Sequence, residues 1–156
     1  MKVRIIGSGT STGVPQIGCT CPVCTSTDPK DNRLRASAIV ETDDARILID
    51  CGPDFRTQVL RLPFEKIDGV LITHEHYDHV GGLDDLRPFC RFGSVPIYAE
   101  DYVAQGLRFA YALLQRIQAK KTYFIHMSHD MGLHAEVEKS LPENIHLAFD
   151  GLDIYL

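Results

Sequence analysis

The stretch that decides the fold is Gly69-Val-Leu-Ile-Thr73, followed at once by His74-Glu-His76-Tyr-Asp78-His79. Its first part is rich in β-branched residues and too short for a typical helix, so it predicts a buried strand. Its second part places four metal-competent side chains in a loop leaving that strand, where α/β folds usually carry their chemistry. Imidazole and carboxylate suit zinc, manganese or iron. We expect His74 and His76 to face one ion and Asp78 and His79 a second; a solvated polar turn is the alternative.

The composition describes one ordinary globular domain. The chain has 156 residues, of which 44% are hydrophobic and 24% charged, and its net charge is −5. The basic residues form no long run, so nucleic-acid or membrane adhesion is not expected as its main activity. The residues after Met1 predict a strand rather than a signal peptide, and no apolar stretch is long enough to span a membrane. We expect a cytoplasmic protein.

Hydrophobic patterning predicts strands alternating with helices. Such an order favours an α/β (α+β) sandwich with helices outside. Strands are expected over residues 3–7, 69–73, 95–99 and 122–126, with a hairpin formed by 36–42 and 45–50 and a last strand over 145–149. Helices are expected over 54–62, 100–121 and from about 130 to 141. The Gly/Ser/Thr-rich segment 7–13 is expected to be a loop that either contacts substrate through its amides or is purely structural.

The five cysteines divide into two kinds. Cys51 and Cys90 stand alone in apolar surroundings and are predicted to be packing residues. Cys19-Thr-Cys21-Pro-Val-Cys24 instead supplies three thiolates within six residues, which suits a tetrahedral zinc site that takes its fourth ligand from elsewhere. The segment His126-Met-Ser-His129 offers two candidates for that ligand.

Two motifs together resemble a known family. His-x-His-x-Asp-His after an apolar strand, with Ile47-Leu-Ile-Asp50-Cys-Gly52 one strand earlier, is similar to the signature of the metallo-β-lactamase fold superfamily of metal-dependent hydrolases. The resemblance implies an αββα sandwich. It also implies that Asp50 orients the metal-binding loop without binding the metal itself.

Within that superfamily, the cysteine motif and the late His-x-x-His resemble the phosphodiesterases of the bacterial carbon–phosphorus lyase pathway. This resemblance implies that His129 completes a structural zinc site with Cys19, Cys21 and Cys24. It also implies that His126 joins His74, His76, Asp78 and His79 around one or two ions of zinc or manganese. The implied reaction is hydrolysis of a small phosphodiester, cyclic ones included, by metal-activated water, with Asp78 as ligand and proton acceptor.

The chain departs from the family pattern in its centre. Relatives carry another metal-binding histidine and a metal-bridging aspartate before the late histidine, whereas residues 102–121 contain neither residue type. We therefore interpret 1–156 as a single shortened domain with an internal deletion near 112–115. We expect incomplete metal binding and a homodimer that exchanges halves. The alternatives are a noncatalytic zinc-stabilised relative, a thiolester or lactam hydrolase, and a tRNA 3′-end hydrolase of the same fold.

Overall fold

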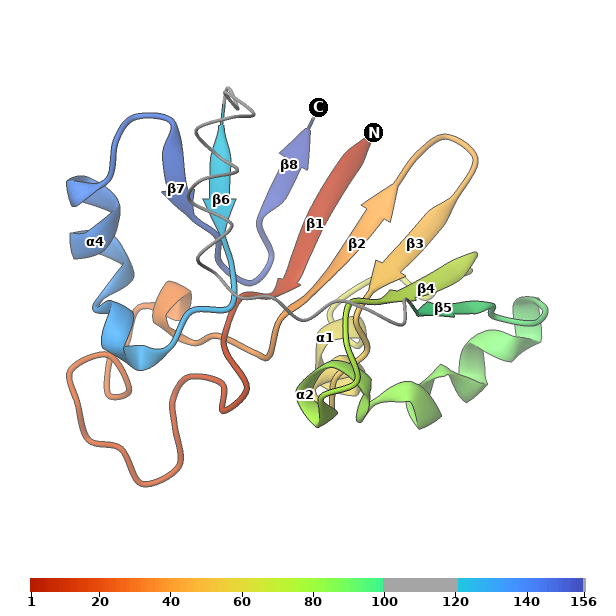
Figure 1. Cartoon of the computed structure of the whole chain (residues 1–156), viewed down its shortest axis with the longest axis horizontal. Coiled ribbons are helices and arrows are strands. Elements are labelled where there is room, and N and C mark those ends of the chain that lie inside the picture. Colours follow the sequence, from red (N-terminus) through yellow and green to blue (C-terminus); the bar gives the residue numbers. More distant parts are fainter. Residues whose placement is uncertain (100–120, 156) are drawn as a thin grey trace.

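The computed structural model describes residues 1–99 and 121–155. Its largest element is a six-stranded sheet in the order β5-β4-β3-β2-β1-β8 (Figure 1). The strands are β1 (Lys2–Gly7), β2 (Ser37–Glu41), β3 (Arg46–Ile49), β4 (Gly69–Ile72), β5 (Ile97–Ala99) and β8 (Asp153–Tyr155). A second sheet pairs β6 (Thr122–Phe124) with β7 (Ile145–Leu147). The helix predicted over 100–121 and the junction near 112–115 lie outside the described residues.

Strand direction determines which loops meet. Strands β2 and β3 form the predicted antiparallel hairpin, in which Glu41 pairs with Arg46. Strands β3, β4 and β5 then run parallel, with Ile49 opposite Leu71. The segments that leave β3 and β4 therefore emerge at one edge of the sheet. The expected metal-binding loop leaves β4 there.

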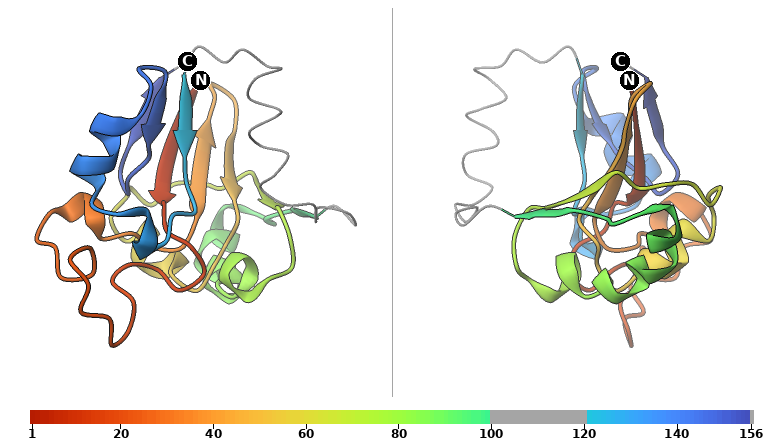
Figure 2. Two further views of the ribbon diagram at one scale, coloured as in Figure 1. Left: turned by 60° about the vertical axis from the view of Figure 1, so that its left-hand side comes forward. Right: turned by 90° about the vertical axis from the view of Figure 1, so that its right-hand side faces the viewer.

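The large sheet has an apolar layer on each face. On one face Ile39, Leu48 and Val70 pack against Phe55 and Phe89 from the helical side. On the other face Ile5 and Ala38 pack with Ala148, and Tyr123 of the small sheet covers them. The views in Figure 2 show the small sheet beside one face of the large sheet, with α4 outside it. The predicted α/β sandwich with external helices is confirmed.

The helices are short and surround this sandwich. They are α1 (Phe55–Val59), α2 (Tyr77–Val80) and α4 (His134–Ser140), with 3₁₀ turns η1 (Pro29–Asp31), η2 (Leu83–Phe92) and η3 (His129–Met131). Pro63 and Pro142 follow the first and last of the predicted helical segments, as expected from the missing amide hydrogen of proline. Within the described residues, no helix is both long and apolar enough to cross a lipid bilayer.

Two sequence predictions about the fold are wrong. The strand predicted over 145–149 is not the last one, because Asp153–Tyr155 adds β8 beside β1. Cys90 is exposed rather than a packing residue, because Leu86 and Phe89 are the residues of η2 that are buried. Cys51 does lie in the core, where burial raises the pKa of its thiol to about 12.

Candidate metal centres

The loop after β4 packs tightly against the segment that leaves β3. The Cys51 amide donates to the carbonyl oxygen of His79 at 2.7 Å, and the Gly82 amide donates to that of Cys51 at 2.8 Å. A Cβ atom at Gly52 would overlap the carbonyl oxygen of Asp78, so only glycine allows this approach. The histidine loop is therefore held by the backbone of the neighbouring strand end.

Asp50 is the side chain that orients this loop. It is 4% exposed and has a φ of 58°, a left-handed conformation that aspartate tolerates better than most residues. Its Oδ2 lies 2.7 Å from Nδ1 of His79, and its Oδ1 accepts from the Thr73 amide at 2.8 Å. The Thr73 hydroxyl donates to the same carboxylate. These contacts match the orienting role that the family resemblance implied, and that role stays a prediction.

The hydrogen bond to Asp50 determines which nitrogen of His79 carries the proton. A carboxylate can only accept, so Nδ1 donates and Nε2 keeps its lone pair. His79 is 4% exposed, and its Nε2 is buried without a hydrogen-bond partner among the described residues. Asp78 Oδ2 lies 3.1 Å from this nitrogen. Two acceptors that face each other without a shared proton fit a cation between them.

His126 brings a third ligand to the same place. It follows β6 with a φ of 65°, and its Nε2 lies 3.8 Å from Oδ2 of Asp78. One ligand atom from each of Asp78, His79 and His126 lies within 4.8 Å of the others. His126 is 40% exposed at its side chain, so this group opens to solvent. The donor set and its open side fit a metal that keeps a free coordination position.

His74 and His76 lie next to this group. The rings of His74 and His79 are 3.9 Å apart, and those of His74 and His76 are 4.7 Å apart. Burial, together with the neighbouring His79 and His76, lowers the pKa of His74, which favours the neutral imidazole that metals bind. Within the described residues, His74 and His76 belong to no group of three close ligands. Their assignment to a separate ion stays a prediction.

The three cysteines of the motif lie beside His129, which follows His126 by three residues. His129 Nδ1 lies 3.4 Å from the Sγ atoms of both Cys19 and Cys21. Ligand atoms of these three residues and Cys24 all lie within 4.8 Å of one another. Hydrogen bonds from the Cys24 amide and from His129 lower the pKa of Cys21 to about 6, toward the thiolate form that binds metal. This Cys3His cluster has the composition of a structural zinc site.

Two other polar features near the clusters make contacts within the protein. Four amides of the 7–13 segment are already bonded, because those of Ser8, Gly9, Thr10 and Gly13 donate to protein oxygens. The buried His134 begins α4, and its Nε2 contacts the carbonyl oxygen of Leu147 at 3.2 Å.

Three supporting residues were not recognised from the sequence. Thr73 hydrogen-bonds to Asp50 and lies 3.0 Å from His74 Nδ1 through its hydroxyl. Arg33 and Asp31 form a buried ion pair beneath the late histidine segment. The position of Thr73 directly before His74 was the one available signal, whereas nothing in the 31–33 sequence marks those charges as buried.

Comparison with known proteins shows the family of the chain. Residues 45–138 match the family model described as the beta-lactamase superfamily domain. The chain belongs to the metallo-β-lactamase superfamily. The matched range includes Asp50, the histidine loop and both late histidines.

Three relatives show how far the similarity extends. A solved structure described as a new diphosphatase from the PhnP family has a TM-score of 0.84 at 28% identity, covering 99% of this chain and 97% of that one. A Porphyromonas gingivalis protein named octanoyltransferase is 53% identical over 109 residues, 69% of this chain and 22% of its own length. Coenzyme PQQ synthesis protein B of Rhodopseudomonas palustris (strain TIE-1) is 35% identical over 121 residues, 69% of this chain. The chain spans 38% of that protein and about a fifth of the Porphyromonas one.

Proposed function

We propose that this chain is a metal-dependent hydrolase of phosphodiester or diphosphate linkages. The observation that carries the proposal is the group formed by Asp78, His79 and His126, in which the buried Nε2 of His79 has no hydrogen-bond partner among the described residues. Zinc or manganese suits this ligand set. When bound, such ions lower the pKa of a water molecule and hold phosphate oxygens.

The protein side chains then have distinct tasks. Asp50 keeps the lone pair of His79 directed toward the site through the 2.7 Å contact with Nδ1. Asp78 lies between the two imidazoles, 3.1 Å from His79 Nε2 and 3.8 Å from His126 Nε2, where it can also accept a proton from the attacking water. His76 and His126 are exposed, so a substrate can reach the group from solvent.

Attack by water is favoured over attack by a protein nucleophile. Among the described residues close to the strand ends, the Ser8 hydroxyl is buried and donates to Asp150 at 2.8 Å. The Cys51 thiol is fully buried with its pKa raised to about 12 by desolvation, which keeps it protonated and unreactive. The similarity to a structure named as a PhnP-family diphosphatase supports phosphorus as the centre attacked.

A second candidate is a noncatalytic, zinc-stabilised chain. It is favoured by the contrast between the two clusters: four ligand atoms meet at the Cys3His cluster, and three meet at the open group beside His74 and His76. A site with fewer protein ligands holds its metal more weakly. Retention of zinc without turnover would indicate this function.

Hydrolysis assays on the metal-loaded protein test the proposal. The purified chain, loaded with Zn²⁺ or Mn²⁺, should hydrolyse bis(p-nitrophenyl) phosphate or a nucleoside diphosphate, and chelation should abolish turnover. His126→Ala should lower kcat/KM by about 100-fold or more, since about 100-fold is the smaller end of the effect of one positioned catalytic group. His146→Ala is the matched control, because His146 lies on β7 and pairs with Glu138 of α4. Turnover that survives both chelation and His126→Ala would overturn the proposal.

A further inference from the structure

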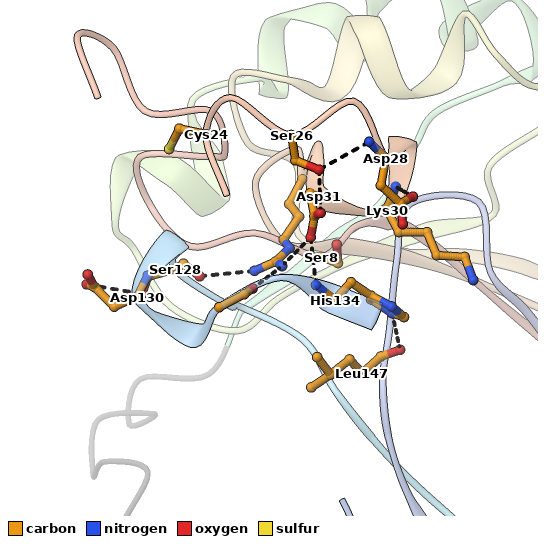
Figure 3. Close-up of polar contacts among 12 residues, drawn as sticks. Ser8, Cys24, Ser26, Asp28, Lys30, Asp31, Ser128, Asp130, His134 and Leu147 are labelled. Atoms are coloured by element: carbon orange, nitrogen blue, oxygen red, sulfur yellow. Dashed lines mark hydrogen bonds and ion pairs between the residues drawn. The ribbon is translucent and has the colours of Figure 1, made fainter. Parts of the chain in front are cut away.

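Arg33 is the most deeply buried charged side chain of the described residues, with 1% exposure. Its guanidinium contacts Asp31 Oδ1 at 3.2 Å and donates to the carbonyl oxygens of Ser128 at 3.0 Å and Gly132 at 3.1 Å. Asp31 in turn accepts from the His134 amide at 2.7 Å. Figure 3 shows Asp31 close to Ser128 and His134, where the chain before β2 meets the segment after β6.

The two carbonyl groups held by Arg33 lie on either side of His129. Ser128 directly precedes that histidine, and Gly132 ends the 3₁₀ turn His129–Met131 that contains it. The same Ser128 lies two residues after His126. Arg33 therefore holds a short segment that contributes a ligand to each cluster. His126 belongs to the group with Asp78 and His79, here called the carboxylate–histidine group, and His129 belongs to the Cys3His cluster.

The segment is also attached upstream through the backbone. The Met127 amide donates to the Ser8 carbonyl oxygen at 2.9 Å, and the Thr10 amide donates to that of Met127 at 3.2 Å. Met127 is 2% exposed. With Met127 fixed before Ser128 and Arg33 holding the backbone after it, a shift of His129 has few ways to relax without moving His126 as well.

A buried ion pair alone would not require this arrangement. Removing an arginine and its acid from water is costly, and apolar side chains of similar volume often stabilise a core equally well. Although desolvation opposes it, the amide of His134, the Ser26 hydroxyl and the Arg33 charge lower the pKa of Asp31, so the pair stays ionised. The guanidinium supplies what an apolar side chain cannot, namely donors in a rigid fork that fit two separated carbonyl oxygens.

We propose that Arg33 is a positioning residue that couples the two metal clusters of this chain. Arg33 holds His126 and His129 in fixed relation, so that filling the Cys3His cluster orders the segment and strengthens metal binding at Asp78, His79 and His126. The coupling is reciprocal, as linkage requires. The inference rests on the proposed function in one respect, that the carboxylate–histidine group binds metal.

Two metal probes separate the clusters. Co²⁺ bound by cysteine thiolates gives a sulfur-to-metal charge-transfer band, which reports the Cys3His cluster alone because the other group has no sulfur ligand. Mn²⁺ prefers oxygen ligands to thiolates, so its electron paramagnetic resonance titration reports the group that contains Asp78. Mn²⁺ affinity is measured on wild-type protein with zinc in the cysteine cluster and again after that zinc is removed.

Arg33→Lys is the informative variant, because lysine keeps the charge beside Asp31 but its single nitrogen lacks the rigid fork. Arg33→Met is the stronger second variant. Arg4→Met is the matched control, since Arg4 forms a part-buried pair with Asp153 and, among the described residues, has no hydrogen bond to segment 126–132. Circular dichroism melts identify any variant that fails to fold.

In the wild type, zinc in the cysteine cluster should strengthen Mn²⁺ binding by about 5-fold or more, within the usual range of coupling between sites. Arg33→Lys should weaken Co²⁺ binding at the thiolates and bring the zinc effect on Mn²⁺ close to 1-fold, while Arg4→Met changes neither. Equal Mn²⁺ affinity with and without zinc in the wild type would overturn the coupling, as would an Arg33→Lys protein with unchanged coupling. If the wild type binds no Mn²⁺ under either condition, the proposed function fails together with the coupling.

Discussion

Replacing Asp50 with asparagine tests how the group of Asp78, His79 and His126 is held in position. Asparagine keeps the volume of the side chain, tolerates the left-handed backbone at φ 58° and retains an oxygen for the Thr73 amide. It loses the negative charge that now lies 2.7 Å from His79 Nδ1. If the amide nitrogen faces His79, the imidazole proton must move to Nε2, and the lone pair directed toward Asp78 is lost.

The expected effect follows from these contacts. Groups that orient a metal-binding histidine through its second nitrogen are worth about 10–100-fold in metal affinity, or about 1.4–2.7 kcal/mol. Because Asp50 and His79 are both 4% exposed, solvent cannot replace the lost contact, and we expect the upper half of that range. The Cys3His cluster has no contact with Asp50 and should keep its zinc with wild-type affinity.

The assay is a Mn²⁺ titration of protein that already holds one equivalent of zinc. Asp54→Asn is the control, because Asp54 accepts from the Arg35 amide and guanidinium near α1 and has no hydrogen bond to the histidine loop. Asp50→Asn should weaken Mn²⁺ binding at least tenfold while Asp54→Asn changes it less than twofold. A folded Asp50→Asn protein with Mn²⁺ affinity within threefold of wild type would refute the reasoning.

Three further outcomes are expected. Cys21→Ser should release one tightly bound zinc and lower the melting temperature, because metal binding at such clusters is coupled to folding. Mass-spectrometric metal counting and a thermal melt measure these two effects, and an unchanged zinc content and melting temperature would contradict the prediction. Asp153→Asn should destabilise the protein at pH 7, and its difference from wild type in urea melts should shrink as the pH falls from about 4 toward 2, since the hydrogen bonds from Arg4 lower the pKa of Asp153 to about 2. Sedimentation at several concentrations should reveal a homodimer, because Leu71 and Tyr98 are paired in register and are 44% and 57% exposed on one sheet face; a monomer throughout would exclude it.

The main strands could be predicted because their patterns are local. The apolar run at 69–73 and the hairpin around Asp43-Asp44 became β4 and the β2–β3 pair, with bounds within one or two residues of those expected. Strand β8 could not be recognised in the same way. Its three residues, Asp153–Tyr155, carry too little pattern, and the strand exists because β1 offers a partner about 150 positions earlier in the chain.

The candidate metal ligands could be predicted from their residue types, whereas the residues that hold them in position could not. His79 and Asp78 were recognisable from their spacing, but the burial that separates His79 from the exposed His76 depends on packing by the segment after β3. Arg33 reads as an ordinary loop charge in the sequence. Its role arises because the chain returns about 95 residues later and places two carbonyl oxygens over it.

The distance along the chain between the thiols and their imidazole has a consequence for synthesis. Cys19 and His129 are 110 residues apart. A ribosome adding about 5–20 residues per second needs roughly 6–22 seconds to deliver the histidine after the first cysteine. Throughout that interval the nascent chain presents three thiols without their fourth partner, open to oxidation or to capture of another soft metal. Cellular zinc supply and reducing power during translation should therefore influence how much correctly metallated protein is made.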